Sequence, residues 1–71
     1  MLRVREVRRA KDITQEEFAR RMGVSQSTVS DWETEQAAPS ITTFMRMAKE
    51  LGCSLDYLAG LSDTNIVPNA G

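Results

Sequence analysis

Histidine is absent from this 71-residue chain, and cysteine occurs only once. Without histidine the chain lacks the commonest general base of enzymes. A single cysteine forms no internal disulfide, and with no histidine beside it there is no set of zinc ligands. The adjacent Glu16 and Glu17 are better explained by the dipole of a helix start than by acid–base chemistry. We therefore expect no enzymatic activity, no metal site and no other cofactor.

Long apolar runs are also absent, as is a basic segment followed by an apolar leader. We therefore expect no membrane contact and a cytoplasmic protein. With 41% hydrophobic residues and few β-branched runs, the chain favours one small helical domain. We interpret Cys53 as a small buried residue between two helices, with a redox sensor as the alternative.

Positive charge is in short supply, because nine basic residues are set against ten acidic ones and the net charge is −1. Residues 1–14 hold five basic and two acidic side chains, which gives this segment a charge of +3. Residues 15–35 hold two basic and five acidic side chains, which gives −3. A polyanion would favour the first segment, and the acidic middle segment argues against nucleic-acid binding.

The sequence does contain a pattern of two short helices joined by a tight turn, between Thr14 and Glu33. Phe18 and Met22 lie at positions i and i+4, which puts them on one face of the first of these helices. Gly23 follows, and glycine adopts a positive φ at no steric cost. It can therefore close the helix and turn the chain sharply.

Ser25 then provides an N-cap for a second helix, in which Val29 and Trp32 predict a buried side. The rest of the helix start carries small, uncharged polar residues that no core requires, namely Gln26, Ser27, Thr28 and Ser30. Side chains of this kind form hydrogen bonds with base edges in a DNA groove. The segment therefore predicts a helix-turn-helix that binds DNA.

Helices are also predicted on either side of this motif, so that the fold class is all-α with five helices. The first covers about residues 2–11, with Val4 and Val7 inward and its arginines on the outer faces. Thr14 and Glu17 form a capping-box pattern at the start of the second helix.

The fourth helix is predicted to follow the N-cap Ser40 and to end at Gly52, and a short fifth helix follows Ser54. The residues expected to face inward in these two helices are Ile41, Phe44, Met45, Ala48, Leu51, Leu55, Leu58, Ala59 and Leu61. Residues 1–61 then form one domain, and residues 62–71 form a tail that is either frayed or an arm used in dimerisation. Our predicted dimer surface combines the fifth helix with the tail: Leu55, Leu58, Leu61, Ile66 and Val67.

Over residues 4–61 these motifs resemble the phage Cro and repressor-like helix-turn-helix domains, often called the XRE family. The similarity is carried by V-R-x-V-R at 4–8, I-T-Q-E-E-F-A at 13–19, M-G-V-S-Q-S-T-V-S-x-W-E at 22–33, A-P-S at 38–40 and L-G-C-S-L-D-Y-L at 51–58. The resemblance implies a compact five-helix domain in which the second and third helices form the helix-turn-helix and the third lies in the major groove.

The resemblance also implies roles for individual residues. Contacts to base edges are implied for Gln26, Ser27, Thr28 and Asp31. Contacts to the DNA backbone are implied for Thr14, Gln15, Ser25, Ser30, Thr34, Ser40 and Arg8. Gln15 is further implied to brace Gln26, and Arg8 and Glu33 to form an ion pair between helices.

Three positions depart from the family pattern. Family members commonly carry Arg, Lys or Asn in place of Asp31, and a glycine followed by a basic residue in place of Glu35 and Gln36. The carboxylate of Asp31 only accepts hydrogen bonds, as from cytosine N4, and the charge of Glu35 repels a phosphate. We therefore expect modest DNA affinity from a monomer and strong dependence on a second subunit.

The function predicted from these observations is a sequence-specific transcriptional regulator of prokaryotic or phage origin that binds double-stranded DNA as a homodimer. We expect repression, which is the commoner action of a bare domain of this kind, and no small-molecule ligand. One alternative is a protein-interaction module that kept the fold and lost DNA affinity. Another is the DNA-binding part of a longer, effector-sensing protein.

Overall fold

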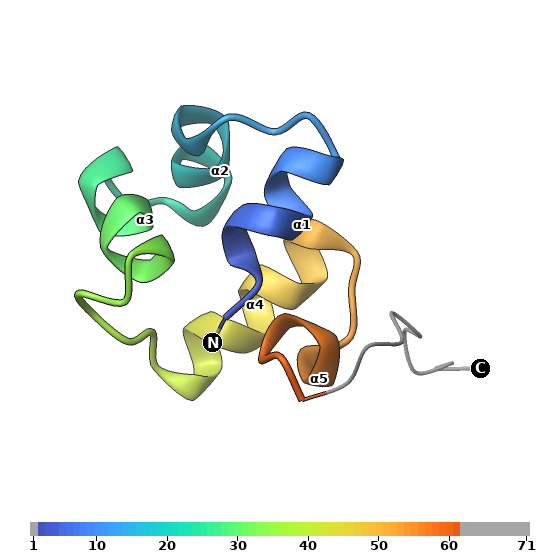
Figure 1. Ribbon diagram of the computed structural model, residues 1–71. Helices are drawn as coiled ribbons and strands as arrows, with labels where there is room; N and C mark the ends of the chain where they lie inside the picture. The colour runs from blue at the N-terminus through green and yellow to red at the C-terminus, as the bar shows by residue number, and fades with distance from the viewer. Residues whose placement is uncertain (1, 62–71) are drawn as a thin grey trace.

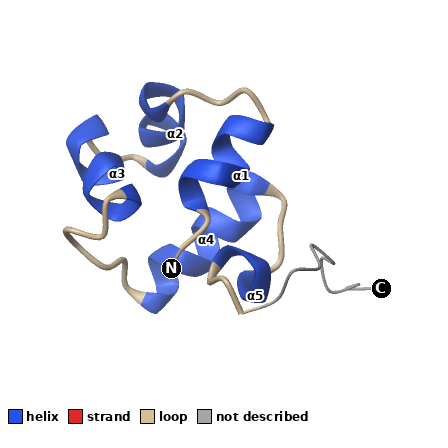
Figure 2. Cartoon of the chain, viewed as in Figure 1, coloured by secondary structure: helices blue, strands red, loops and turns tan. Residues whose placement is uncertain are grey.

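A computed structural model describes residues 2–61, which form five α-helices and no strand (Figures 1 and 2). The helices are α1 (Val4–Ala10), α2 (Gln15–Met22), α3 (Gln26–Glu33), α4 (Ile41–Leu51) and α5 (Leu55–Leu58). The predicted all-α fold class is confirmed, and α1 is shorter than the predicted span of residues 2–11. No helix within the described residues is long and apolar enough to cross a membrane.

Hydroxyl side chains start the last four helices, as the sequence predicts. Each accepts a hydrogen bond from the backbone N–H three residues further along, at 3.0 to 3.2 Å: Thr14, Ser25, Ser40 and Ser54. Within residues 2–61 only this first half of the expected capping box forms, because the Glu17 carboxylate accepts instead from Arg20 and Arg21. Local capping therefore sets where the helices begin.

All five helices contribute to one hydrophobic core. The two helices of the turn motif, α2 and α3, pack against each other, and α1 and α4 close the core from the other side (Figure 1). The core residues are Val4, Val7, Ile13, Phe18, Ala19, Met22, Val29, Trp32, Met47, Ala48, Leu51, Cys53 and Leu58. Because this core holds α2 and α3 in place, the polar side of α3 is left free to face solvent.

The buried stripe of α4 is rotated from the predicted one. Met47 is fully buried, whereas Ile41 and Met45, which we expected inside, are 70% and 54% exposed. Successive helical residues are separated by about 100° around the axis, so the face centred on Phe44, Ala48 and Met47 turns Met45 outward. Apolar residues occupy more than half of this helix, and its sequence alone does not select which of them face the core.

The predicted dimer surface needs a correction at Leu58. This residue is fully buried in the core of the domain, so it is unavailable for contact with a second subunit. Leu55 and Leu61 are 37% and 80% exposed, because α5 ends at Leu58 and the chain then turns at Gly60, where φ is +80°. The other two residues of the prediction, Ile66 and Val67, lie outside the described residues.

Cys53 is buried between α4 and α5, as the sequence predicts. Burial raises the pKa of its thiol, and the nearby charge of Lys11 only partly opposes this effect. A thiol held in its neutral form is a poor nucleophile, which favours the structural interpretation over a redox sensor.

Candidate nucleic-acid interface

The turn between α2 and α3 has the geometry that the sequence predicts. Gly23 adopts the left-handed conformation with φ +72°, and the N–H of Val24 bonds to the carbonyl of Ala19 at 3.0 Å. Ala19 is only 4% exposed, and its small side chain lets the two helices approach closely. The turn therefore fixes the angle between α2 and α3.

On α3, buried and exposed residues separate as an amphipathic helix requires. Val29 and Trp32 are in the core, whereas Gln26, Ser27 and Asp31 are exposed. Ser27 and Asp31 are four residues apart and so lie on one face. The structure thus places Ser27 and Asp31 on one exposed face of α3 with Gln26 exposed at its start, whereas the fourth predicted base-contacting residue, Thr28, is half-buried.

Three hydroxyls form a small cluster at the start of α3. The Ser25 Oγ lies 3.0 Å from the Ser27 Oγ and 2.9 Å from the Thr28 Oγ1. Thr28 is half-buried and Ser27 is exposed. Each hydroxyl has a donor and two acceptor positions, so the cluster can still offer hydrogen bonds outward while it holds the helix start rigid.

An ion pair connects α1 to the end of α3. Arg8 donates from Nε to Glu33 Oε2 at 2.7 Å and from Nη2 to Glu33 Oε1 at 3.1 Å, and its Nη1 donates to the carbonyl of Ile13 at 2.7 Å. The side chains of Arg8 and Glu33 are only 9% and 2% exposed. Arg8 therefore does not lie on an outer face of α1 as predicted, whereas the implied ion pair with Glu33 is present.

Glu33 remains charged in this environment. Burial by itself would raise the pKa of its carboxyl group, but hydrogen bonds from Arg8 and Gln15 and the positive charges of Arg8 and Arg5 outweigh it. The net effect lowers the pKa of Glu33 below its ordinary value. At neutral pH the ionised carboxylate of Glu33 acts only as a hydrogen-bond acceptor.

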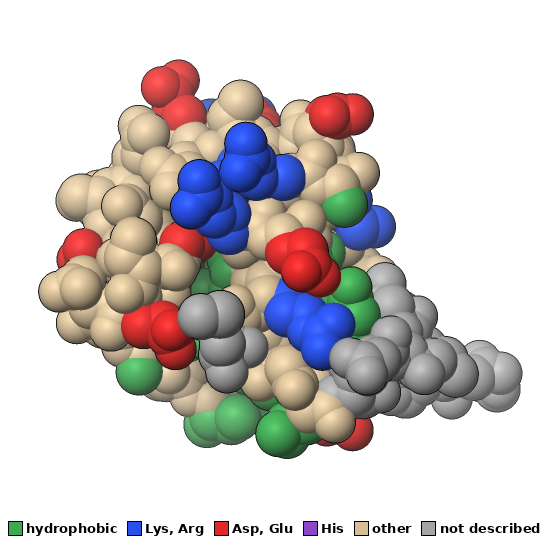
Figure 3. All heavy atoms as spheres, viewed as in Figure 1, with side chains coloured by type: hydrophobic (Ala, Val, Ile, Leu, Met, Phe, Trp, Pro, Cys, Tyr) green, Lys and Arg blue, Asp and Glu red, His purple; other side chains and the backbone are tan. Residues whose placement is uncertain are grey.

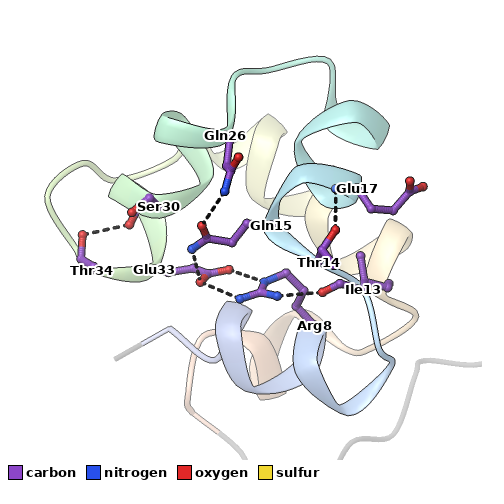
Figure 4. Close-up of polar contacts among 9 residues, drawn as sticks. All are labelled: Arg8, Ile13, Thr14, Gln15, Glu17, Gln26, Ser30, Glu33 and Thr34. Carbon is purple, nitrogen blue, oxygen red and sulfur yellow. Dashed lines mark hydrogen bonds and ion pairs between the residues drawn. The ribbon is translucent and has the colours of Figure 1, made fainter.

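Gln15 joins this ion pair to the outer side of α3 (Figure 4). Its Nε2 donates to Glu33 Oε1 at 3.0 Å, and its Oε1 accepts from Gln26 Nε2 at 3.4 Å. The brace between Gln15 and Gln26 that the family resemblance implies is thus present. The bond from Gln15 to Glu33 was not predicted, since residues 18 positions apart give no local signal.

A polar hollow lies between α1 and α3, lined mostly by backbone-contact candidates and by three arginines. The lining includes Thr14, Gln15, Gln26, Ser30 and Thr34, together with Arg5, Arg8, Arg9 and Glu33. Figure 3 shows Lys and Arg side chains gathered over α1 beside this region. The structure therefore assembles most of the backbone-contact candidates at one place, whereas Ser40 is at the start of α4, beyond the loop.

Several of these candidates already have partners within the protein. The Thr34 Oγ1 donates to the backbone carbonyl of Ser30 at 2.9 Å. Arg8 uses three of its five N–H donors internally. Arg5 and Arg9 are exposed. They are the stronger candidates for contact with a phosphate, whereas the family resemblance implies this role for Arg8 alone among the arginines of α1.

The loop after α3 shows how the departure at Glu35 is accommodated. Glu35 has φ +60°, in the left-handed region that glycine occupies without strain. The N–H groups of Gln36 and Ala37 bond to the carbonyl of Asp31 at 2.8 and 3.3 Å, so the loop closes tightly on the end of α3. The sequence therefore keeps a backbone shape suited to glycine and places a negative charge there.

Comparison with known proteins supports the interpretation of α2 and α3 as a helix-turn-helix. The model of the helix-turn-helix family matches residues 4–58. Repressor protein C2 of Salmonella phage P22 is 35% identical over 66 residues, which cover 90% of this chain and 31% of that protein. The cryptic phage CTXphi transcriptional repressor RstR of Vibrio cholerae is 33% identical over 64 residues, which cover 90% of this chain and 58% of that protein.

Two further comparisons concern a bacterial regulator and a solved structure. The uncharacterized HTH-type transcriptional regulator YobD of Bacillus subtilis is 31% identical over 61 residues, covering 86% of this chain and 54% of that protein. The chain thus spans between about a third and three fifths of the length of these three relatives. A crystal structure of the P22 c2 repressor protein in complex with a synthetic operator matches with a TM-score of 0.77 and 32% identity, over 84% of this chain and 91% of that one.

The family match covers well over half of the chain, and its bounds run from the start of α1 to the end of α5. The chain therefore belongs to the helix-turn-helix family, in the group of Cro- and phage-repressor-like (XRE) domains.

Proposed function

We propose that this protein is a sequence-specific transcriptional repressor that binds double-stranded DNA with α3 in the major groove. The observation that carries the proposal is the outer side of α3, where exposed polar side chains are held on a helix anchored by Val29 and Trp32. The relatives named above, from bacteria and phages, are described as repressors or transcriptional regulators, and the similar P22 structure contains an operator. We accordingly place its action in the cytoplasm of a bacterial cell.

The chemistry of the candidate residues assigns each a different contact. The amide of Gln26 suits adenine, which presents an N7 acceptor and an N6 donor, and the hydroxyl of Thr28 suits several base edges. Asp31 accepts hydrogen bonds only, so it favours the N4 donor of cytosine. Phosphates would be bound by Arg5 and Arg9, which flank the polar hollow.

A homodimer follows from the same proposal. One α3 contacts only a few base pairs, and proteins of this class reach useful specificity by binding two half-sites about 34 Å apart. Leu55 and Leu61 are exposed apolar side chains that suit contact with a second copy. We expect Leu61→Glu to weaken operator binding and dimer formation together, which sedimentation with and without operator DNA would detect.

The decisive experiment is selection from a random double-stranded DNA pool at low salt. We expect the wild-type protein to enrich a pseudo-palindrome and Gln26→Ala/Thr28→Ala to lose preference at defined positions. Arg9→Ala is the matched control, because loss of a phosphate contact weakens binding to all sequences about equally. Enrichment of the same motif by the wild type and the double variant would exclude α3 as the segment that reads the bases.

The acidic residues of the interface favour one alternative, a protein-interaction module on the same fold. Asp31 and Glu35 are both exposed at or beside the end of α3, where they repel phosphates. Salt separates the two functions. DNA binding through phosphates weakens steeply and linearly on a log–log scale as salt rises. Absence of enriched DNA from the wild-type selection would favour the protein partner.

A further inference from the structure

A chain of hydrogen bonds runs from the buried ion pair to the first exposed residue of α3. Arg8 donates to Glu33, Gln15 donates to the same carboxylate at 3.0 Å, and Gln26 donates to Gln15 at 3.4 Å. Figure 4 shows these side chains in sequence, with the Gln26 amide at the outer end. No buried side-chain nitrogen or oxygen within residues 2–61 lacks a partner. This series of hydrogen bonds therefore connects the charged carboxylate of Glu33 to Gln26, a candidate base-contacting residue.

The direction of this chain is set at Glu33. A carboxylate accepts hydrogen bonds and an amide has one donor end and one acceptor end. Gln15 must therefore turn its NH₂ group to Glu33, which leaves its Oε1 facing Gln26. Gln26 must in turn direct its NH₂ group toward Gln15, and its Oε1 is left as the free acceptor on the outer side.

We propose that Glu33 is a positioning residue that determines, through Gln15, which end of the Gln26 amide is presented to DNA bases. The inference rests on the proposed function and deepens it. In the observed direction the outer end of Gln26 combines the Oε1 acceptor with the second N–H of Nε2. This pair of groups matches adenine, whose N6 donates and whose N7 accepts in the major groove.

Glu33→Gln provides the sharpest test, because it keeps the shape of the side chain and changes its donors and acceptors. The new amide oxygen has two possible positions. At Oε2 it keeps the 2.7 Å bond from Arg8 Nε, and at Oε1 it keeps the bonds from Arg8 Nη2 and Gln15. In the first case the new NH₂ group faces Gln15, which must rotate its amide, so that Gln26 presents its NH₂ group outward. Glu33→Gln therefore loses the single direction that the carboxylate imposes.

The experiment is base selection at the operator position where Gln26→Ala loses preference. We expect the wild-type protein to favour adenine there by about tenfold. Glu33→Gln should weaken this preference and shift part of it toward guanine, whose N7 and O6 both accept. Gln15→Met removes the connection and leaves the ion pair intact, so it should weaken the adenine preference without reversing it. Arg9→Met is the control and should leave the preference unchanged.

The outcomes separate the two proposals. If the wild-type protein enriches a motif and both Glu33→Gln and Gln15→Met keep the full adenine preference that Gln26→Ala loses, the positioning role is excluded and the DNA-binding function stands. If Glu33→Gln does not fold, unchanged preference in Gln15→Met alone excludes it. If the wild-type protein enriches no DNA, both proposals are overturned. A role of Glu33 in stability alone would lower overall affinity and would leave the base preference at this position unchanged.

Discussion

Two neighbouring arginines of α1 provide a direct test of how the domain is held together. Arg8 is buried and bonds to both oxygens of Glu33 and to the carbonyl of Ile13, whereas Arg9 is exposed. The substitutions Arg8→Met and Arg9→Met remove the same charge from adjacent positions of one helix. Methionine keeps most of the side-chain length and forms helices about as readily as arginine, so helix propensity does not distinguish the two variants.

The expected destabilisation follows from the burial of Glu33. Without Arg8, its carboxylate is a charge that is 2% exposed, and among residues 2–61 the side chain that still donates a hydrogen bond to it is Gln15. Removal of one partner from a buried ion pair typically costs about 3–5 kcal/mol, whereas an exposed substitution changes stability by about 0.5 kcal/mol or less. A domain of this size is stable by roughly 4–11 kcal/mol. Arg8→Met should therefore remove about a quarter or more of the total.

Urea denaturation at pH 7 measures this difference directly. Trp32 is the only tryptophan in the chain and is 5% exposed, so its fluorescence reports on the opening of the core. A difference of less than about 1 kcal/mol between the free energies of unfolding of Arg8→Met and Arg9→Met would show that the buried ion pair does not stabilise the domain. Replacement of both partners, in Arg8→Met/Glu33→Met, should recover part of the loss, because no unpaired charge remains buried.

Two further predictions concern acidic residues near the end of α3. Glu35→Gly should stabilise the domain by about 1 kcal/mol, because φ is +60° at this position and glycine adopts a positive φ without strain. Glu35→Ala should not stabilise it. Equal denaturation midpoints for these two variants would contradict the prediction. The folded-state pKa of Glu33 lies below its ordinary value of 4.5, so its contribution is complete above that pH and is lost as the pH falls through the lowered pKa. Between pH 7 and pH 3 the free energy of unfolding, measured by denaturation, should therefore fall more for the wild type than for Glu33→Gln.

Much of this fold could be predicted from the sequence because it depends on neighbouring residues. A hydroxyl side chain at an N-cap acts on a backbone group three residues away, and glycine at position 23 acts on its own φ. The starts of α2 to α5 and the turn of the helix-turn-helix were therefore predictable. The spacing of Val29 and Trp32 likewise fixed which side of α3 is buried, and with it the exposed position of Gln26.

Tertiary structure decided the features that depend on how one helix is rotated against another. Arg8 follows Val4 by four residues and shares its buried face, but only the approach of Glu33 from α3 makes that burial stable. The choice of Met47 over Met45 in the core of α4 has the same origin, because more than half of the residues of this helix are apolar.

In the candidate interface, too, some features were determined by local sequence and others by the packing of the helices. Local sequence determined that α3 presents small polar side chains outward, since a helix with a 3.6-residue period and one apolar side has no other stable orientation. The bond from Gln15 to Glu33 and the hollow flanked by Arg5 and Arg9 join residues far apart in the chain. Only the packing of α1, α2 and α3 brings these groups within hydrogen-bonding distance, because the direction of a hydrogen bond depends on the three-dimensional position of both partners.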